Sequence, residues 1–241
     1  MCGIVGYIGE KEAANFILEG LKKLEYRGYD SAGIAVYDGK QIQVRRFAGK
    51  LVNLVNSLEE QKICGKIGIG HTRWATHGEP NDRNAHPVTG ATGRVVVVHN
   101  GIVENYLSLR EELESEGVNF LTETDTESIV HLIEKYMSLG NNLVTSLKNA
   151  LRMVKGANAI VAFSSDEPDT IVAARLGNAG GVVIGYGQGE MYVASDIPAI
   201  LGHTTKMSFL DSRQIAIIKK EQAIFEDLDG NKVTPDIQQI S

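Results

Sequence analysis

The 241-residue chain has a formal net charge of −6, a hydrophobic fraction of 43% and a charged fraction of 22%, which are ordinary values for a soluble globular protein. Charges of both signs are mixed along the chain and form no basic stripe, which argues against nucleic-acid binding. The apolar runs are too short to span a bilayer and the first residues do not read as a signal peptide, so we expect a cytoplasmic protein. Its two cysteines do not make a disulfide framework.

Hydrophobic periodicity and turn residues predict strands at both ends of the chain and helices in its middle. The first half is expected to form strands at 3–8, 32–37, 41–47, 66–73 and 94–99, with helices at 13–24 and 51–59. Further helices are expected at 106–116, 126–137 and 143–154. The strands expected after them are 158–164, 170–175, 181–186, 191–194, 206–210, 214–219 and 222–226.

This order of elements lacks strict βαβ alternation, which disfavours a doubly wound parallel sheet. It favours an α+β fold with two stacked, mostly antiparallel sheets covered by helices. Asn105 is expected to cap the helix at 106–116, and Gly117 to end it. Cys64 is interpreted as a partly buried small residue, and residues 235–241 show no element of their own.

Cys2 directly follows the initiator methionine, which is commonly removed when the next side chain is small. Removal of Met1 would leave a residue with both a thiol and a free α-amine, and an N-terminal amine can act as the base for a nucleophile. With a pKa of about 7.7–8.0, roughly a third of such an amine is neutral near pH 7.5, against about a thousandth of a lysine amine. Cys2 would then need no histidine partner.

The alternative is that Cys2 is merely a small residue at a disordered terminus. The apolar stretch Gly3-Ile4-Val5-Gly6 argues against this, because it is typical of a buried strand that would hold the terminus in a sheet. The pair Met1-Cys2 is a weak signal by itself, so motifs further along the chain decide between the two interpretations.

Four segments carry distinctive strings: Cys2–Gly6 (CGIVG), Glu25–Gly33 (EYRGYDSAG), Gly70–Gly78 (GHTRWATHG) and His99–Asn105 (HNGIVEN). Together they resemble the class II glutamine amidotransferases, a branch of the N-terminal nucleophile hydrolases. Within that class the strings RGYDSAG and TRWATHG are similar to those of the glutaminase domains of glutamine–fructose-6-phosphate aminotransferases. The resemblance runs nearly from end to end of the chain.

The resemblance implies a four-layer αββα sandwich, the N-terminal nucleophile hydrolase fold. It places the glutamine amidotransferase domain at residues 2–234 and makes residues 235–241 the start of a linker to a sugar-phosphate isomerase domain that the chain lacks. The full enzyme would use L-glutamine and fructose 6-phosphate, and it could be a homodimer.

The resemblance makes Cys2 the nucleophile that attacks the side-chain amide of glutamine. Asn100 and Gly101 would supply the oxyanion hole through the Asn side chain and the Gly backbone N–H, and such donors contribute about 3–4 kcal/mol each. The alternative for Asn-Gly is a two-residue hairpin turn. That alternative is weakened because a helix, not a second strand, is expected to follow.

Two charged residues would hold the two ends of glutamine. Arg73 would bind the α-carboxylate, for which a guanidinium fork is suited. Asp125, in the string Thr124-Asp125-Thr126-Glu127, would contact the α-ammonium. The alternatives are an exposed Arg at a strand end and an Asp that caps a helix, although a residue near a cap could do both.

Three neighbouring residues, Trp74, Thr76 and His77, belong to a loop that in the family closes over bound glutamine, and Thr76 and His77 are expected to line the substrate site. Trp74 is the only tryptophan of the chain, and its polar neighbours suit a gate better than a core residue. Arg27 resembles the residue that steadies the surroundings of the nucleophile and substrate, and a surface ion pair is the alternative.

No metal or other cofactor is expected, because the histidines lack metal-ligand spacing. A structural interpretation is given to four of them: His86, His99, His131 and His203. One departure from the family lies at Arg175–Val182, where many relatives carry Ser-Pro-Leu after the Arg. The glycines Gly180 and Gly181 imply a looser loop there.

The expected reaction is hydrolysis of L-glutamine to L-glutamate and ammonia through a Cys2 thioester, with ammonia supplied for glucosamine 6-phosphate synthesis. One alternative is the glutaminase domain of another class II amidotransferase, such as that of phosphoribosylpyrophosphate amidotransferase or asparagine synthetase. Another is a glutamine-binding module, if Met1 is retained. A third is an amide hydrolase for a substrate that is not an amino acid, against which the pair Arg73 and Asp125 argues.

Overall fold

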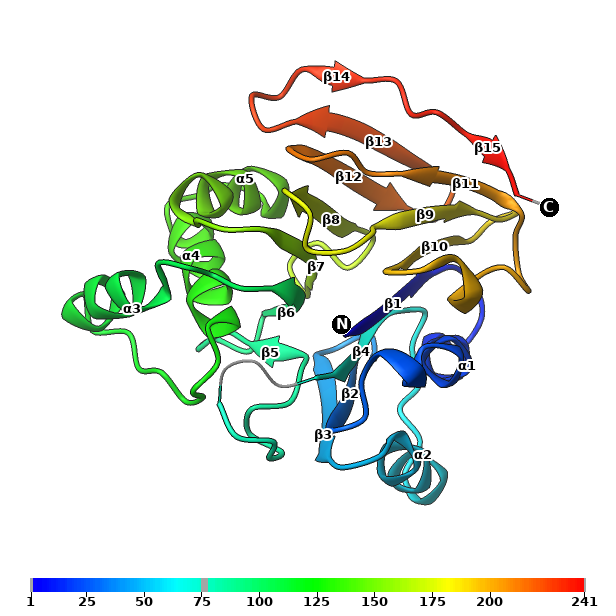
Figure 1. Ribbon diagram of the computed structural model, residues 1–241, viewed down its shortest axis with the longest axis horizontal. Helices are drawn as coiled ribbons and strands as arrows, with labels where there is room; N and C mark the ends of the chain where they lie inside the picture. Colours follow the sequence, from blue (N-terminus) through cyan, green and yellow to red (C-terminus); the bar gives the residue numbers. More distant parts are fainter. Residues whose placement is uncertain (1, 75–77, 241) are drawn as a thin grey trace.

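The computed structural model describes residues 2–74 and 78–240, and its strands form two stacked sheets between two groups of helices (Figure 1). The first sheet consists of β1 (Gly3–Ile8), β2 (Ser31–Tyr37), β3 (Ile42–Ala48), β4 (Ile67–Arg73), β9 (Val183–Tyr186), β10 (Met191–Ala194), β11 (Lys206–Phe209) and β15 (Gln238–Gln239). The second consists of β5 (Val88–Thr89), β6 (Val95–Gly101), β7 (Asn158–Ser164), β8 (Ile171–Leu176), β12 (Gln214–Lys219), β13 (Gln222–Asp227) and β14 (Lys232–Val233).

The helices cover the outer faces of this pair of sheets. They are α1 (Ala13–Lys23), α2 (Leu51–Glu60), α3 (Tyr106–Ser115), α4 (Thr126–Ser138) and α5 (Leu143–Met153), with the short 3₁₀ helices η1 (Glu25–Arg27) and η2 (Ile197–Ala199). In Figure 1, α1 and α2 lie on the side of the first sheet, and α3, α4 and α5 lie on the side of the second.

The strand order explains why the start of the chain is held in place. The first sheet has the order β15-β11-β9-β10-β1-β4-β2-β3, so β1 lies in its interior between β10 and β4. The second has the order β14-β13-β12-β8-β7-β6-β5. Among the described residues all recorded strand pairings are antiparallel.

Alternating apolar side chains within single strands build three hydrophobic layers, because successive residues of a strand point to opposite faces. In β6, Val95 and Val97 pack with α4 and α5, whereas Val96 and Val98 pack between the two sheets. In β1, Val5 packs with α1 and α2. The predicted α+β fold with four αββα layers is therefore confirmed.

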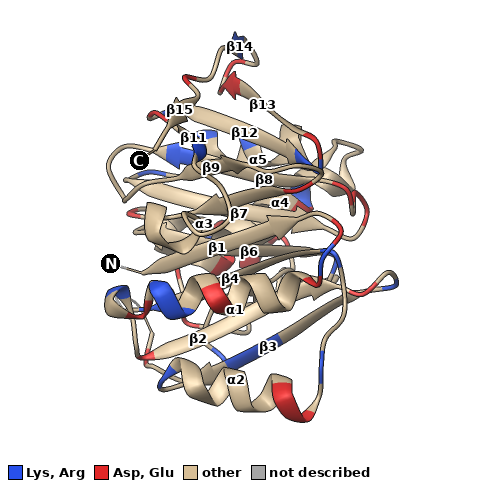
Figure 2. Ribbon diagram, turned by 90° about the vertical axis from the view of Figure 1, so that its right-hand side faces the viewer, with Lys and Arg blue, Asp and Glu red and all other residues tan. Residues whose placement is uncertain are grey.

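Charge follows the same layering. In Figure 2 the charged segments lie mainly on helices and loops, and the strands are mostly uncharged, with the basic segment of β3 among the exceptions. That segment contains Arg45 and Arg46, and β3 is the edge strand of the first sheet.

The elements expected from the sequence are all present, with boundaries within about two residues, as is usual for helix and strand ends. The expectation that residues 235–241 contain no element is wrong, because β15 pairs with β11 through Lys206↔Gln239 and Met207↔Gln238. The two-residue strands β5 and β14 were also not expected. Such strands have too few residues to show a period of two.

Two local expectations are wrong as well. Asn105 occupies the cap position of α3, but its side chain makes no cap hydrogen bond. It accepts from the backbone N–H of Lys155 at 2.8 Å and donates to the carbonyl of Met153 at 2.9 Å, so it ties the start of α3 to the end of α5. Cys64 is exposed rather than partly buried.

Candidate active site

A cavity of about 390 Å³ opens where several strand ends meet. Because β1 and β4 are antiparallel, with Gly3 opposite Thr72, the start of β1 lies beside the end of β4. The end of β6 and the start of α4 complete the wall. The residues lining the cavity are Cys2, His71, Arg73, Trp74, His86, His99, Asn100, Gly101, Ile102, Asp125, Thr126, Asn178 and Ala179.

Cys2 stands at the rim of this cavity, one residue before β1. Its Sγ accepts a hydrogen bond from the backbone N–H of Trp74 at 3.1 Å and lies 3.5 Å from the Trp74 carbonyl oxygen. The next residues are fixed by Ser195, whose Oγ accepts from the Ile4 N–H at 2.9 Å and whose N–H donates to the Ile4 carbonyl at 3.0 Å. The sulfur therefore contacts the backbone of Trp74, while Ser195 holds the residues that follow it.

Burial raises the pKa of the Cys2 thiol above its ordinary value, although the N–H of Trp74 and the charge of Arg73 oppose this effect. At neutral pH the sulfur is therefore mostly protonated. A thiol in this state needs a neighbouring base before it can attack a carbonyl carbon.

Asn100 directs its side-chain amide at the nucleophile. Its Nδ2 donates to the carbonyl oxygen of Cys2 at 2.9 Å, and its Oδ1 lies 3.0 Å from Nε2 of His71. The same Nε2 lies 3.1 Å from the carbonyl of His99. Both neighbours are acceptors, so Nε2 must carry the proton, and burial keeps the ring neutral by lowering the pKa of His71 to about 3. His71 thereby fixes which way the Asn100 amide faces.

Gly101 follows at the last position of β6, where only glycine fits. Its φ is +126°, a region that other residues rarely adopt, and a Cβ there would lie 2.2 Å from the carbonyl oxygen of Ala157. Asn100 and Gly101 still pair with Ala159 and Asn158 of β7. The Asn-Gly pair therefore ends β6, the strand next to the edge of the second sheet, and it does not form the alternative two-residue hairpin turn.

Arg73 and Asp125 bring opposite charges to the same cavity, and both side chains are buried. Burial lowers the pKa of Arg73, while the charges of Asp30, Cys2 and Asp125 act in the opposite direction. Arg73 donates through Nη2 to the carbonyl of Gly78 at 3.3 Å. A guanidinium and a carboxylate in one cavity match the two charged groups of a free amino acid.

The alternative interpretation of Asp125 as a helix cap holds for its position and not for its side chain. The residue precedes α4, but it makes no side-chain cap hydrogen bond. Its Oδ2 accepts from the backbone N–H of Val103 at 2.7 Å, which links the start of α4 to the segment after β6.

Of the remaining expected site residues, one lines the cavity, one lies outside its wall, and two lie outside the described residues. Trp74 lines the cavity with half of its surface exposed, and its ring packs edge-to-face on Tyr29 at 5.4 Å between centroids. Arg27 is not among the lining residues. Buried Arg27 forms an ion pair at 2.6 Å with the partly exposed Asp196 and donates to the Ser195 carbonyl at 3.5 Å, so it contacts the segment that holds β1. Thr76 and His77 lie outside the described residues.

Several lining residues were not expected from the sequence. His86 and His99 both hydrogen-bond Oγ1 of Thr126, at 2.8 and 2.9 Å, and His86 stacks on His71 at 4.5 Å between centroids. These contacts agree with the structural role given to both histidines, yet they also place the two rings in the cavity wall. His71 and Arg73 are two residues apart in β4, so strand periodicity alone could have put His71 on the face of Arg73.

The segment expected to depart from the family also contributes to the wall, through Asn178 and Ala179. Arg175 holds this loop by donating to Oδ1 of Asn178 at 3.2 Å and to the Leu210 carbonyl at 2.8 Å. Gly177 and Gly180 both have positive φ, at +60° and +119°. The departure therefore lies within the site itself.

Across residues 2–74 and 78–240, no group of three or more His, Cys, Asp or Glu side chains is placed to hold a metal ion. Within the same residues, no helix combines the length and apolar character needed to cross a membrane.

An αββα sandwich with Cys2 at the start of a central strand defines the class of N-terminal nucleophile amidotransferases. The chain matches the family described as "Glutamine amidotransferase domain" over residues 58–236, and it belongs to that family.

Curated relatives carry the name glutamine–fructose-6-phosphate aminotransferase (isomerizing). The protein from Clostridium tetani is 47% identical over 241 residues, which cover all of this chain and 39% of the relative. The protein from Thermococcus kodakarensis is 46% identical over 242 residues, which cover all of this chain and 40% of the relative. The chain thus spans about two fifths of the length of these relatives.

Solved structures give the same fold. The glutamine phosphoribosylpyrophosphate amidotransferase of B. subtilis superposes with a TM-score of 0.82 at 29% identity, over 96% of this chain and 50% of that one. A glutamine aminotransferase class-II domain protein from Silicibacter pomeroyi superposes with a TM-score of 0.63 over 94% of this chain and 99% of that one. At 18% identity the second similarity concerns the fold alone.

Proposed function

We propose that this domain hydrolyses L-glutamine to L-glutamate and ammonia through a thioester on Cys2. One observation carries the proposal: a partly exposed cysteine, the amide of Asn100 and the opposite charges of Arg73 and Asp125 share one cavity. This set provides a nucleophile, an oxyanion donor and a clamp for an amino acid whose side chain ends in an amide.

The first half-reaction begins with removal of Met1, which frees the α-amine of Cys2. Arg73 holds the α-carboxylate of the bound glutamine, and Asp125 holds its α-ammonium. The amine of Cys2 takes the thiol proton, and Sγ attacks the side-chain amide carbon of glutamine. The negative charge passes to the amide oxygen, which Asn100 Nδ2 and the Gly101 N–H stabilise. The C–N bond then breaks, the proton returns to the leaving nitrogen, and ammonia and a thioester remain.

The second half-reaction replaces sulfur by water. The same α-amine takes a proton from water, the hydroxide adds to the thioester carbon, and the same donors hold the oxyanion. Collapse expels the Cys2 sulfur, which takes the proton back, and glutamate leaves. Trp74 stands at the cavity rim, and Thr76 and His77 would complete the loop that closes over the substrate.

The proposal extends to the use of the ammonia. The relatives named above are aminotransferases that act on fructose 6-phosphate, and their names favour glucosamine 6-phosphate as the final product of the whole enzyme. In this account residues 2–234 form the glutaminase domain, and residues 235–241, whose β15 pairs with the first sheet, lead to a sugar-phosphate isomerase domain. The enzyme works in the cytoplasm as a homodimer. The sequence identities of 46–47% to these relatives favour this assignment over the phosphoribosylpyrophosphate amidotransferase of B. subtilis, to which the sequence identity is 29%.

The deciding experiment measures glutamate release from L-glutamine by the purified chain, with the intact mass read on the same sample. We expect release by protein that has lost Met1, and no release by Cys2→Ala, which should still bind glutamine. Turnover by Cys2→Ala would refute the thioester.

A second measurement separates hydrolysis from mere binding. Protein that retains Met1 should bind glutamine without turnover, because its base is blocked. If protein with a free Cys2 binds glutamine but releases no glutamate even when the isomerase domain is supplied, the domain is a binding module and the proposed reaction is wrong.

A further inference from the structure

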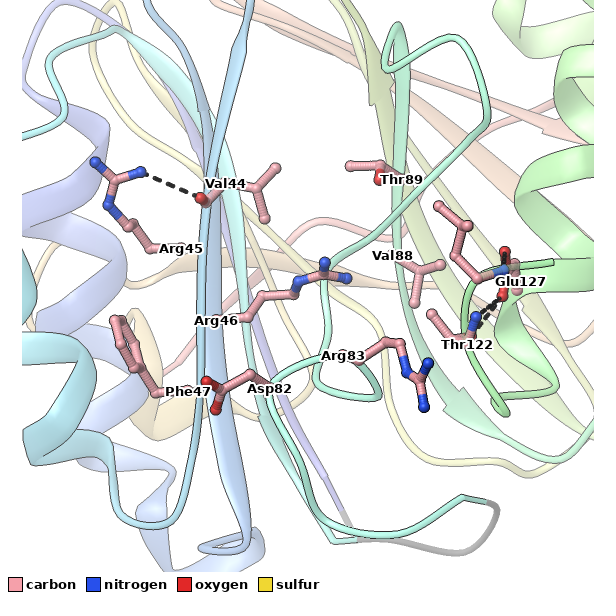
Figure 3. Close-up of a pocket in the computed structure, with 11 residues that line it drawn as sticks. Val44, Arg45, Arg46, Phe47, Asp82, Arg83, Val88, Thr89, Thr122 and Glu127 are labelled. Atoms are coloured by element: carbon pink, nitrogen blue, oxygen red, sulfur yellow. Dashed lines mark hydrogen bonds between the residues drawn. The ribbon is translucent and has the colours of Figure 1, made fainter. Parts of the chain in front are cut away.

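A second cavity, of about 600 Å³, opens at the edge of the sandwich and shares no lining residue with the Cys2 site. It lies between β3 and β5, which are the edge strands of the first and second sheets, and the start of α4 closes it (Figure 3). Its volume is in the range of small-molecule sites, about 300–1,000 Å³.

Strand periodicity decides which side chains of β3 enter this cavity. Val44 and Arg46 point from β3 toward the side of Val88 (Figure 3). Arg45 is also among the lining residues, but its guanidinium extends to the opposite face of the strand. Arg45 is engaged there, since it donates to Oε1 of Gln61 at 2.9 Å and to the Val44 carbonyl at 3.4 Å. The guanidinium groups of the neighbouring residues Arg45 and Arg46 therefore lie on opposite faces of β3.

The two arginines that enter the cavity keep most of their donors available. Among the residues that the structure describes, Arg46 makes one hydrogen bond, from Nη1 to the Pro87 carbonyl at 3.3 Å. Arg83, from the loop before β5, makes no hydrogen bond or ion pair with any residue of the described ranges. Each guanidinium has five N–H donors, so both residues keep several donors for a ligand of the cavity.

The acidic groups that line the cavity are already engaged. Glu127 accepts from the N–H groups of Leu121 and Thr122 and from the Thr122 hydroxyl, at 2.6–2.7 Å, and it also pairs with His131. Asp82 accepts from the backbone N–H of Ala48 at 2.6 Å. Neither carboxylate forms an ion pair with Arg46 or Arg83 in the described residues.

Part of the remaining wall is apolar. Val44 and buried Val88 face each other across the cavity, and Leu121 stands at its rim with 64% of its surface exposed. An exposed leucine beside free guanidinium donors suits a ligand with an apolar ring as well as a negative charge.

We propose that this cavity binds a small organic phosphate, with the phosphate held between Arg46 and Arg83 and a ring or apolar portion against Val44, Val88 and Leu121. Guanidinium groups bind phosphate oxygens through paired hydrogen bonds, and such bonds to charged groups are roughly twice as strong as neutral ones. The site is separate from the glutamine cavity and does not depend on the proposed reaction.

The test uses phenyl phosphate as the probe, with inorganic phosphate and phenol as its two halves, and binding is measured by calorimetry and by NMR shifts of the Val44, Val88 and Leu121 methyl groups. Phenyl phosphate should bind more tightly than either half. Arg46→Gln and Arg83→Gln should each weaken its binding by about tenfold or more. Arg45→Gln is the matched control, because it removes the same charge from the opposite face of β3.

Several outcomes would overturn the site. Absence of phenyl phosphate binding at millimolar concentration would do so, as would equal losses for Arg45→Gln and Arg46→Gln, since a general charge effect would then explain both. Arg83 is exposed on a loop, so Arg83→Gln tests the site even if Arg46→Gln unfolds. Binding of phenol as strong as that of phenyl phosphate would also refute a phosphate site.

Discussion

At the scale of the residue, the position of one amide depends on one imidazole. Asn100 presents Nδ2 to Cys2 because its Oδ1 is occupied by the N–H of His71. A ring with a pKa of about 3 stays neutral at every physiological pH, so this hydrogen bond does not switch with protonation.

We therefore expect His71→Leu to lower the glutaminase kcat by about tenfold or more with a smaller change in KM, because Asn100, the proposed oxyanion donor, is misdirected. His71→Gln keeps an N–H for Asn100 and should retain more activity. Steady-state kinetics of both variants give the comparison. If kcat falls equally in both variants, or if KM rises while kcat stays unchanged, His71 does not position Asn100.

Arg73 gives a second prediction at this scale. Arg73→Lys keeps the charge and loses the planar fork, so kcat/KM for glutamine should fall by about tenfold or more. Glutamine titration of the variant in the glutamate-release assay provides the number. An unchanged KM together with an unchanged kcat would remove Arg73 from the role of carboxylate clamp.

At the scale of the element, α4 carries a buried ion pair along one face. His131 lies 3.1 Å from Glu127 one turn earlier, and both are almost fully buried. Burial alone would lower the pKa of His131, but the hydrogen bonds and charges of Glu127 and Glu134 outweigh it and raise that pKa above its ordinary value. For Glu127, burial acts to raise the pKa, and hydrogen bonds from His131 and Thr122 outweigh it and lower the pKa.

The raised pKa of His131 means that the folded state holds this proton more tightly than the unfolded chain. The stabilisation is complete below the unfolded pKa of about 6.5 and is lost as the pH rises through the higher folded pKa. Relative to His131→Gln, the wild-type chain should be more stable by about 1–3 kcal/mol at pH 6, with a smaller difference at pH 9. Urea unfolding of both proteins at the two pH values measures this, and a difference that does not change with pH would contradict it.

At the scale of the whole molecule, stacking of the two sheets buries neutral imidazoles at their interface. His71 and His86 pack ring on ring, and burial lowers the pKa of His71 to about 3 and that of His86 well below its ordinary value. Unfolding exposes both rings to water, where they take up protons below a pH of about 6.5.

Acid should therefore destabilise the fold before its carboxylates are protonated. As the pH falls from about 6.5 toward 5, the unfolding free energy should decrease with a slope that approaches about 1.4 kcal/mol per pH unit for each of the two rings. His86→Gln removes one of the two rings. Its unfolding should take up about one proton fewer, so the slope should be shallower by about 1.4 kcal/mol per pH unit. The measurement is urea unfolding at pH 7, 6 and 5, and identical slopes for both proteins would contradict this account.

The sequence by itself determined the order and type of nearly all elements, because apolar residues at intervals of two or of three to four mark strands and helices wherever the segment is long enough. It also pointed to Cys2, Arg73, Asn100, Gly101 and Asp125, through local strings whose spacing is visible along the chain. These predictions need only local periodicity and resemblance. The two-residue strands β5, β14 and β15 carry too few residues for either.

Only the tertiary structure decided which distant residues share a cavity. His86 and Asn178 line the Cys2 site because sheet stacking and the loop after β8 bring them there, and no spacing in the chain records that approach. Arg46 and Arg83 lie in different segments and line one cavity because it opens between the edge strands β3 and β5. Sequence periodicity shows which face of an element is buried, whereas the packing of whole layers determines what that face contacts.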